Sequence, residues 1–228
     1  MNDPWVRLQQ AAGNSLGWIW NVFAKDGRET AVLAKVAQSP KASGWLVGCM
    51  SAADDDITRK IGAMLAGLIH DEEQTQLLPE LLQIERDRFP LDPLGANSVT
   101  EDILFAAVRW TTYGGECQEM GIDVLANIVR DALETTEWNT AQWAAASLHA
   151  ATGGKHPVID TLTDETTTVP ASLQIVAEAI RLKDSERLAQ LTVTPNPIVD
   201  FPADVTDSHL AAELWAAIRE AEVEALKP

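Results

Sequence analysis

Apolar side chains recur at helical spacing in four separate windows, and this recurrence constrains the fold more than any other feature of the chain. Each window follows the spacing of three and four residues that gathers side chains on one face of an α-helix. Because every such face needs a neighbour to cover it, the sequence predicts an all-α fold of packed helices. The four sets are Ile57, Ile61, Met64, Leu65 and Leu68; Ile122, Leu125, Ala126, Val129 and Leu133; Leu173, Val176, Ala177 and Ile180; and Leu210, Leu214, Ala217, Ile218 and Ala221.

Helix-start signals precede several of these windows. Ser98 with Glu101 has the spacing of a capping box, and Asp71 with Gln74 has similar spacing ahead of the leucine pair at 77–78. We therefore expect one helix to begin just after Ser98 and another to begin shortly before the leucine pair.

Prolines mark further boundaries. Pro79 fits either the first turn of a helix or a kink within one, and Pro170 fits a helix start. Residues 89–97 and 194–205 are rich in proline and predict the two long loops.

Paired glycines indicate a weak internal repeat. The pairs at 114–115 and 153–154 lie 39 positions apart, and each follows an alanine-containing helical window, at 104–113 and 143–152. A glycine pair ends a helix and lets the chain turn back into a second one, so these windows predict helical hairpins with a period near 40 residues.

With this period, residues 53–228 resemble HEAT-like and armadillo-like α-solenoids, in which antiparallel hairpins stack into an extended surface. The likeness is carried by segments such as ITRKIGAMLAGLIHDEEQTQLLPELL and WNTAQWAAASLHAATGGKHPVIDTL. An irregular helical bundle is the alternative architecture. Residues 1–52 hold four of the eight tryptophans and predict an N-terminal helical cap on a single domain, 1–228.

Charge is strongly unbalanced. The chain has 34 acidic and 17 basic side chains, a formal net charge of -17, and residues 61–228 hold 28 acidic against 10 basic side chains. Direct nucleic-acid binding needs clustered Lys and Arg, so this composition argues against it. A basic protein partner is favoured instead, with solubility or adaptation to high salt as the alternative explanation.

Features of secreted and membrane proteins are missing from the sequence. Asp3 and Pro4 stand where a signal peptide has basic residues, and the longest uncharged stretches, 8–24 and 138–154, are too short and too polar for a membrane span. Cys49 and Cys117 have no disulfide or zinc spacing and predict buried thiols. The expected location is cytoplasmic.

The catalytic motifs in the sequence lack the neighbouring structure that they require. Residues 13–17 match the GxSxG pattern of α/β-hydrolases, but no strand pattern delivers Ser15 to a turn, so a catalytic role is rejected. The histidines form neither HExxH nor ExxH. We predict no catalytic residue and no cofactor.

Acidic runs flank the first repeat helix. They lack the alternating ligands and central glycine of a calcium loop, so helix capping is predicted in place of metal binding. The same runs are candidates for binding a basic partner. They comprise Asp54, Asp55, Asp56, Asp71, Glu72 and Glu73.

A column of large side chains is a second candidate for contact with a partner. In the repeat alignment His70 and His149 both fall over Trp110. Such a column could line a concave groove, and packing at the hairpin junction is the alternative.

Together these features predict a non-catalytic acidic binding protein, such as an adaptor or an immunity-type inhibitor that neutralises a basic toxin. The alternative is an enzyme on a helical-repeat scaffold, similar to bilin lyases.

Overall fold

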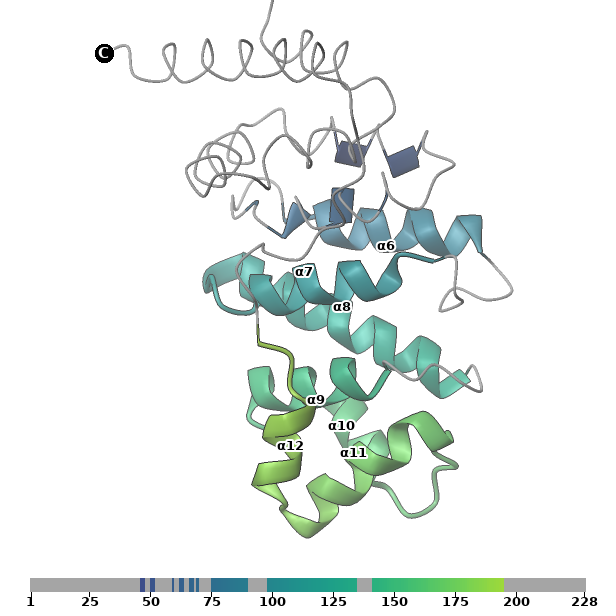
Figure 1. Cartoon of the computed structure of the whole chain (residues 1–228), viewed down its shortest axis with the longest axis vertical. Helices are drawn as coiled ribbons and strands as arrows, with labels where there is room; N and C mark the ends of the chain where they lie inside the picture. The colour runs from purple at the N-terminus through teal and green to yellow at the C-terminus, as the bar shows by residue number, and fades with distance from the viewer. Residues whose placement is uncertain are drawn as a thin grey trace, which may run out of the picture. The chain divides into compact units, whose positions relative to one another are not determined.

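The part of the chain that the structure describes is helical throughout. The computed structural model describes residues 46–47, 50–51, 59, 62–63, 66–67, 69, 75–89, 98–134 and 141–194, and no strand occurs among them. The predicted all-α class is thereby confirmed for these residues. The helices, labelled as in Figure 1, are α6 (Leu77–Arg88), α7 (Thr100–Trp110), α8 (Gly115–Glu134), α9 (Ala141–Thr152), α10 (Pro157–Thr163), α11 (Ala171–Leu182) and α12 (Ser185–Leu191).

Two compact units make up the chain. One consists of Met1–Leu77 with Asn196–Pro228, and the other consists of Leu78–Pro195. The second unit contains nearly all of the described helices. The single domain and the tryptophan-rich cap at 1–52 stay predictions.

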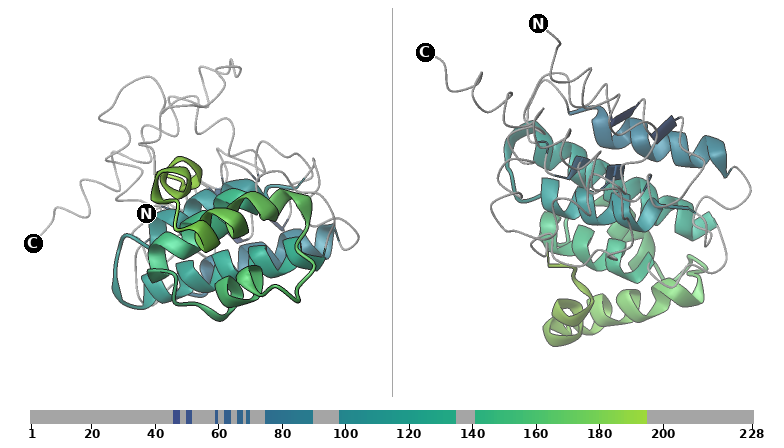
Figure 2. Two further views of the ribbon diagram at one scale, coloured as in Figure 1. Left: turned by 90° about the horizontal axis from the view of Figure 1, so that it is seen from below. Right: turned by 45° about the horizontal axis from the view of Figure 1, so that its top comes forward.

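Neighbours in sequence are also neighbours in space within the Leu78–Pro195 unit. Helix α8 packs against α7 on one side and α9 on the other, and α10 also contacts both α8 and α9. Helix α9 in turn packs against α11 and α12, which contact each other. Figures 1 and 2 show this succession from α7 to α12. Three short connections, α7–α8, α9–α10 and α11–α12, therefore join helices that come one after another through the unit.

The glycine pair at 153–154 ends α9 as predicted, whereas α7 ends earlier than expected, at Trp110, and Gly115 of the other pair is the first residue of α8. Gly114, Gly115, Gly153 and Gly154 all have positive φ. After α9, the Gly154 N–H donates to the His149 carbonyl at 2.8 Å and the Gly153 N–H donates to the Ala150 carbonyl at 3.4 Å. This pair of bonds is the Schellman arrangement, which needs a left-handed residue that glycine adopts without strain.

The predicted capping box before α7 is wrong in detail. The Ser98 hydroxyl accepts the Thr100 N–H at 3.1 Å, and the helix begins one residue later than expected, after Val99. The Val99 N–H donates to the Glu85 carboxylate at 3.2 Å. Glu85 is fully buried and lies in α6, so a residue distant in sequence accepts the backbone N–H of Val99, the residue that precedes α7.

Both proline predictions hold. Pro79 is the third residue of α6, so the first-turn alternative is correct. Pro170 precedes α11, and its carbonyl accepts the N–H groups of Leu173 and Gln174 at 2.9 and 3.1 Å. Cys117 is a buried free thiol, as predicted, whereas Cys49 lies outside the described residues.

The predicted apolar stripes of α8 and α11 face the core. In α8, Leu125, Ala126 and Val129 are buried, and in α11 Leu173 and Val176 are buried. The stripes that begin at Ile57 and Leu210 lie wholly on residues outside the described ranges.

Candidate functional site

All six acidic residues predicted to bind a partner lie outside the part of the chain that the structure describes. This holds for both acidic runs, for His70 and for the GxSxG segment at 13–17. The residues in the two runs are Asp54, Asp55, Asp56, Asp71, Glu72 and Glu73.

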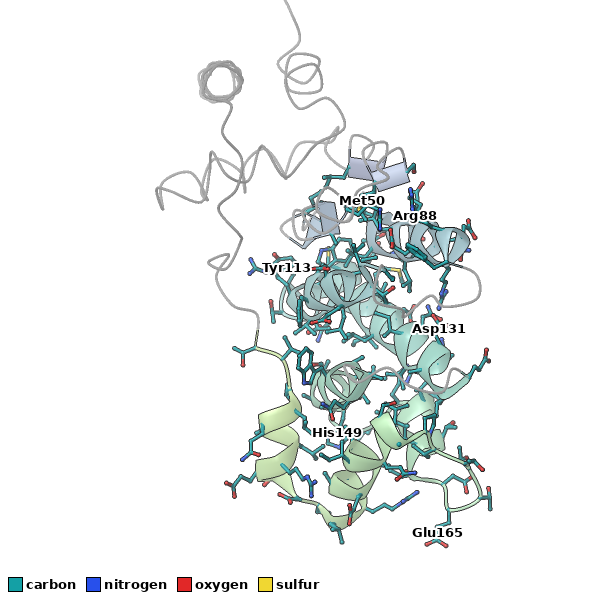
Figure 3. All side chains as sticks on the ribbon, turned by 45° about the vertical axis from the view of Figure 1, so that its right-hand side comes forward. Met50, Arg88, Tyr113, Asp131, His149 and Glu165 are labelled. Carbon is teal, nitrogen blue, oxygen red and sulfur yellow. The ribbon has the colours of Figure 1, made fainter. Side chains whose placement is uncertain are left out.

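The remaining two members of the predicted column are described. Trp110, the last residue of α7, is fully buried. His149, labelled in Figure 3, is half-buried in the last turn of α9, and its ring lies against Gly154. A Cβ atom placed on Gly154 would come within 2.9 Å of the His149 Nε2. These surroundings favour the packing alternative for both side chains.

Helix α8 presents an exposed acidic row. Glu116, Glu119 and Asp123 are separated by three and four residues, the spacing of one helix face, and all three side chains are exposed. Among the residues that the structure describes, no hydrogen bond or ion pair occupies the carboxylates of Glu116 and Glu119. The opposite side of α8 carries the buried residues that hold the helix in the core, so the row is turned away from the packing interface.

Helix α10 contributes a further carboxylate close to this row. His156 caps α10, and the carboxylates of Asp123 in α8 and Asp160 in α10 both act on its imidazole. Arg130, Asp123 and Asp160 all lie within electrostatic reach of His156, where α8 contacts α10. We call Glu116, Glu119, Asp123 and Asp160 the acidic face.

An ion pair joins α8 to α6. The Arg86 guanidinium donates to one Asp131 carboxylate oxygen from Nε at 2.8 Å and from Nη2 at 2.6 Å, and Nη2 also reaches the Asn127 carbonyl at 3.4 Å. Burial raises the pKa of Asp131 above its ordinary value, against the opposing effect of Arg86. These three bonds join α6 to the C-terminal half of α8, on the same helix face as the acidic row and beyond its last residue.

We expect His156 to couple the stability of α10 to pH. Its Nδ1 accepts the Val158 N–H at 3.3 Å, which requires that nitrogen to be unprotonated. Burial, followed by the nearby Arg130, lowers the pKa of His156 below its ordinary value of 6.5, while Asp123 and Asp160 oppose that shift. The unfolded chain therefore binds this proton more readily than the folded chain, and stability is lost as the pH falls below 6.5.

We expect a His156→Asn variant, which keeps a capping acceptor without titrating, to lose less stability than the natural chain on acidification. The difference should approach the value of one helix cap, about 0.5–2 kcal/mol, as the pH is lowered from about 7.5 to about 5. Urea denaturation of both chains at matched pH values measures it. Parallel pH profiles would contradict the capping role.

No metal site and no membrane-spanning helix is found among the residues that the structure describes. Within them, no group of three or more His, Cys, Asp or Glu side chains could hold a metal ion. None of the described helices is long and apolar enough to cross a membrane. Comparisons with known proteins gave no match to a protein-family model, a curated protein or a solved structure.

The acidic face does not appear in the sequence as a run of consecutive carboxylates. Glu116, Glu119 and Asp123 are separated by other residues and form a row only when the segment is wound into a helix. The spacing of three and four residues was the available signal.

Proposed function

We propose that this chain is a non-catalytic binding protein that takes a basic protein partner on the acidic face of α8 and α10. An adaptor or an immunity-type inhibitor of a basic toxin fits this role. The observation that carries the proposal is the row of exposed carboxylates on α8, of which Glu116 and Glu119 have no partner among the described residues.

Geometry supports binding by this face. A helix holds its carboxylates at fixed spacing, so a basic partner meets them without ordering a loop first. Asp160 extends the negative charge onto a neighbouring helix, which widens the surface beyond a single row. Such a surface attracts a basic partner over a distance and orients it during encounter.

The scaffold we propose is a stack of HEAT-like hairpins formed by α7–α8, α9–α10 and α11–α12. Support comes from the contact of α8 with α9 and of α9 with α11, which connect each pair to the next. A pair of glycines with positive φ in each of the α7–α8 and α9–α10 connections supports it as well. Asp54–Asp56 and Asp71–Glu73 stay candidates for enlarging the binding surface, and a cytoplasmic location stays a prediction.

Charge reversal on the acidic face tests the proposal. Affinity for a fluorescent decaarginine peptide, which stands in for a basic partner surface, is measured by anisotropy at about 50 mM salt, where screening is weak. We expect the triple variant Glu116→Lys, Glu119→Lys, Asp123→Lys to bind at least about ten-fold more weakly, since each lost charge pair contributes on the order of 0.5–1 kcal/mol.

A matched variant separates location from total charge. Glu80, Glu165 and Glu186 are also exposed and lie outside α8 and α10, and replacing all three with lysine changes the net charge by the same amount. Glu165 lies in the loop between α10 and α11 and is labelled in Figure 3. We expect this variant to bind within about three-fold of the natural chain. Equal losses of affinity for the peptide in the two triple variants would show that binding depends on the total charge of the chain and not on the acidic face.

A further inference from the structure

His156 lies where α10 begins, within reach of the acidic face. It is half-buried, and its Nδ1 accepts the Val158 N–H at 3.3 Å. The exposed carboxylates of Asp123 in α8 and Asp160 in the first turn of α10 both act on its imidazole. A titratable group is therefore placed beside two of the four carboxylates that form the acidic face.

Charged groups on the other helices around α10 differ in their relation to His156. Arg130 in α8 also acts on the imidazole and is exposed. Helices α9 and α11 contact α10 as well. In α11, Arg181 donates to two carbonyls in the last turn of α10, and in α9 the titratable residue is His149. His149 is therefore the imidazole that a pH experiment must separate from His156.

Protonation of His156 has two consequences for the acidic face. An imidazolium has no acceptor at Nδ1, so the bond from the Val158 N–H is lost and the turn that carries Asp160 loses its cap. The imidazolium also adds a positive charge within reach of Asp123 and Asp160. Both changes oppose a cationic partner, because one weakens the negative potential and the other loosens the turn that holds a carboxylate.

The pH range of this change is set by the histidine. Exposed carboxylates ordinarily stay ionised down to about pH 5, whereas histidine ordinarily changes charge between about pH 5 and 8. Burial, followed by Arg130, lowers the pKa of His156 below 6.5, so the imidazole is neutral at about pH 7.5 and is protonated only in the acidic range.

We propose that protonation of His156 releases the basic partner from the acidic face, so that the partner is bound at neutral pH and released in acid. This inference rests on the proposed function, because it concerns the same partner and the same face. The carboxylates bind the partner, and the imidazole regulates how strongly they do so.

The affinity for the fluorescent decaarginine peptide tests this regulation. Anisotropy is measured at about pH 7.5 and about pH 5, both at about 50 mM salt, and circular dichroism checks that each chain stays folded. We expect the natural chain to lose at least about three-fold more affinity on acidification than His156→Asn, which keeps a capping acceptor without titrating. His149→Asn should lose as much affinity as the natural chain.

A second measurement needs no variant. The pKa of His156 is obtained by NMR from its imidazole C–H shifts, with and without saturating peptide. Linkage requires that a partner released by protonation also opposes protonation, so the peptide should lower the pKa of His156 further. A residue that only supports the fold would titrate alike in both samples.

The outcomes distinguish this regulation from the binding function. If the natural chain and His156→Asn lost affinity equally, or if the peptide left the pKa of His156 unchanged, the regulatory role would be overturned while binding by the acidic face stood. If the peptide did not bind at pH 7.5, or if the triple reversal of Glu116, Glu119 and Asp123 left its affinity unchanged, the proposed function and the regulatory role would both be overturned.

Discussion

Replacing Trp110 with alanine is expected to lower the free energy of unfolding by about 3–5 kcal/mol, because the indole is fully buried at the end of α7 and its removal leaves a large cavity. Loss on this scale is a large share of the roughly 5–15 kcal/mol that stabilises a typical domain. Urea denaturation followed by circular dichroism measures the change.

A matched tryptophan distinguishes packing from contact with a partner. Trp143 in α9 is half-buried, and its ring stacks on the exposed Phe105 of α7 with centroids 6.1 Å apart. Trp143→Ala removes the same side chain from a less enclosed site, so the loss of stability should be clearly smaller. If Trp110→Ala cost no more than Trp143→Ala, a packing role for Trp110 would be wrong.

Substituting Gly121 with alanine is expected to destabilise the fold by about 1–3 kcal/mol, the range for overpacking a close contact. A Cβ atom at this position would stand 2.8 Å from the Ala107 carbonyl oxygen and 3.0 Å from the Thr111 nitrogen. Both atoms are backbone of α7 and its C-terminal turn, so neither can move aside as a side chain could. The clash should outweigh the roughly 1 kcal/mol that alanine gains over glycine inside a helix.

Glu119→Ala provides the control for Gly121, because the residue is exposed on the same helix two positions away. Its effect should stay within about 0.5 kcal/mol. The two chains are compared by thermal and urea denaturation. A Gly121→Ala chain more stable than the natural one would show that α7 and α8 can move apart slightly without losing stability.

Sequence alone predicted the helices whose patterns extend over several turns. The apolar stripes of α8 and α11 repeat often enough to fix both the class and the buried face. The glycine pairs at 114–115 and 153–154 were also recognised, because positive φ is a local requirement that one residue type meets best.

Contacts between distant segments were beyond the reach of local patterns. Ser98 and Glu101 have the spacing of a capping box, yet Glu85 from another helix occupies the Val99 N–H. Gly121 looks like an unfavourable residue in a helix until α7 is placed against it. Helices α10 and α12 have seven residues each, too few turns to establish a periodic pattern.

The binding surface illustrates the same limit. Consecutive carboxylates such as Asp71–Glu73 stand out in the sequence, whereas Asp123 and Asp160 come within electrostatic reach of the same histidine, His156, only when α8 and α10 pack together. Charge composition indicated the chemistry of a partner, but the position of the candidate surface depends on tertiary structure.

Chemical-shift mapping of the full chain with the decaarginine peptide tests most directly whether the acidic face binds a basic partner. Spectra of ¹⁵N-labelled protein are recorded as the peptide is added at about 50 mM salt, the low-screening condition used for the affinity measurements. We predict that the largest amide shifts cluster on α8 around Glu116, Glu119 and Asp123, with a second group at Asp160 in α10. Shifts spread evenly over all exposed acidic residues, or concentrated on helices other than α8 and α10, would contradict a basic partner site on the acidic face.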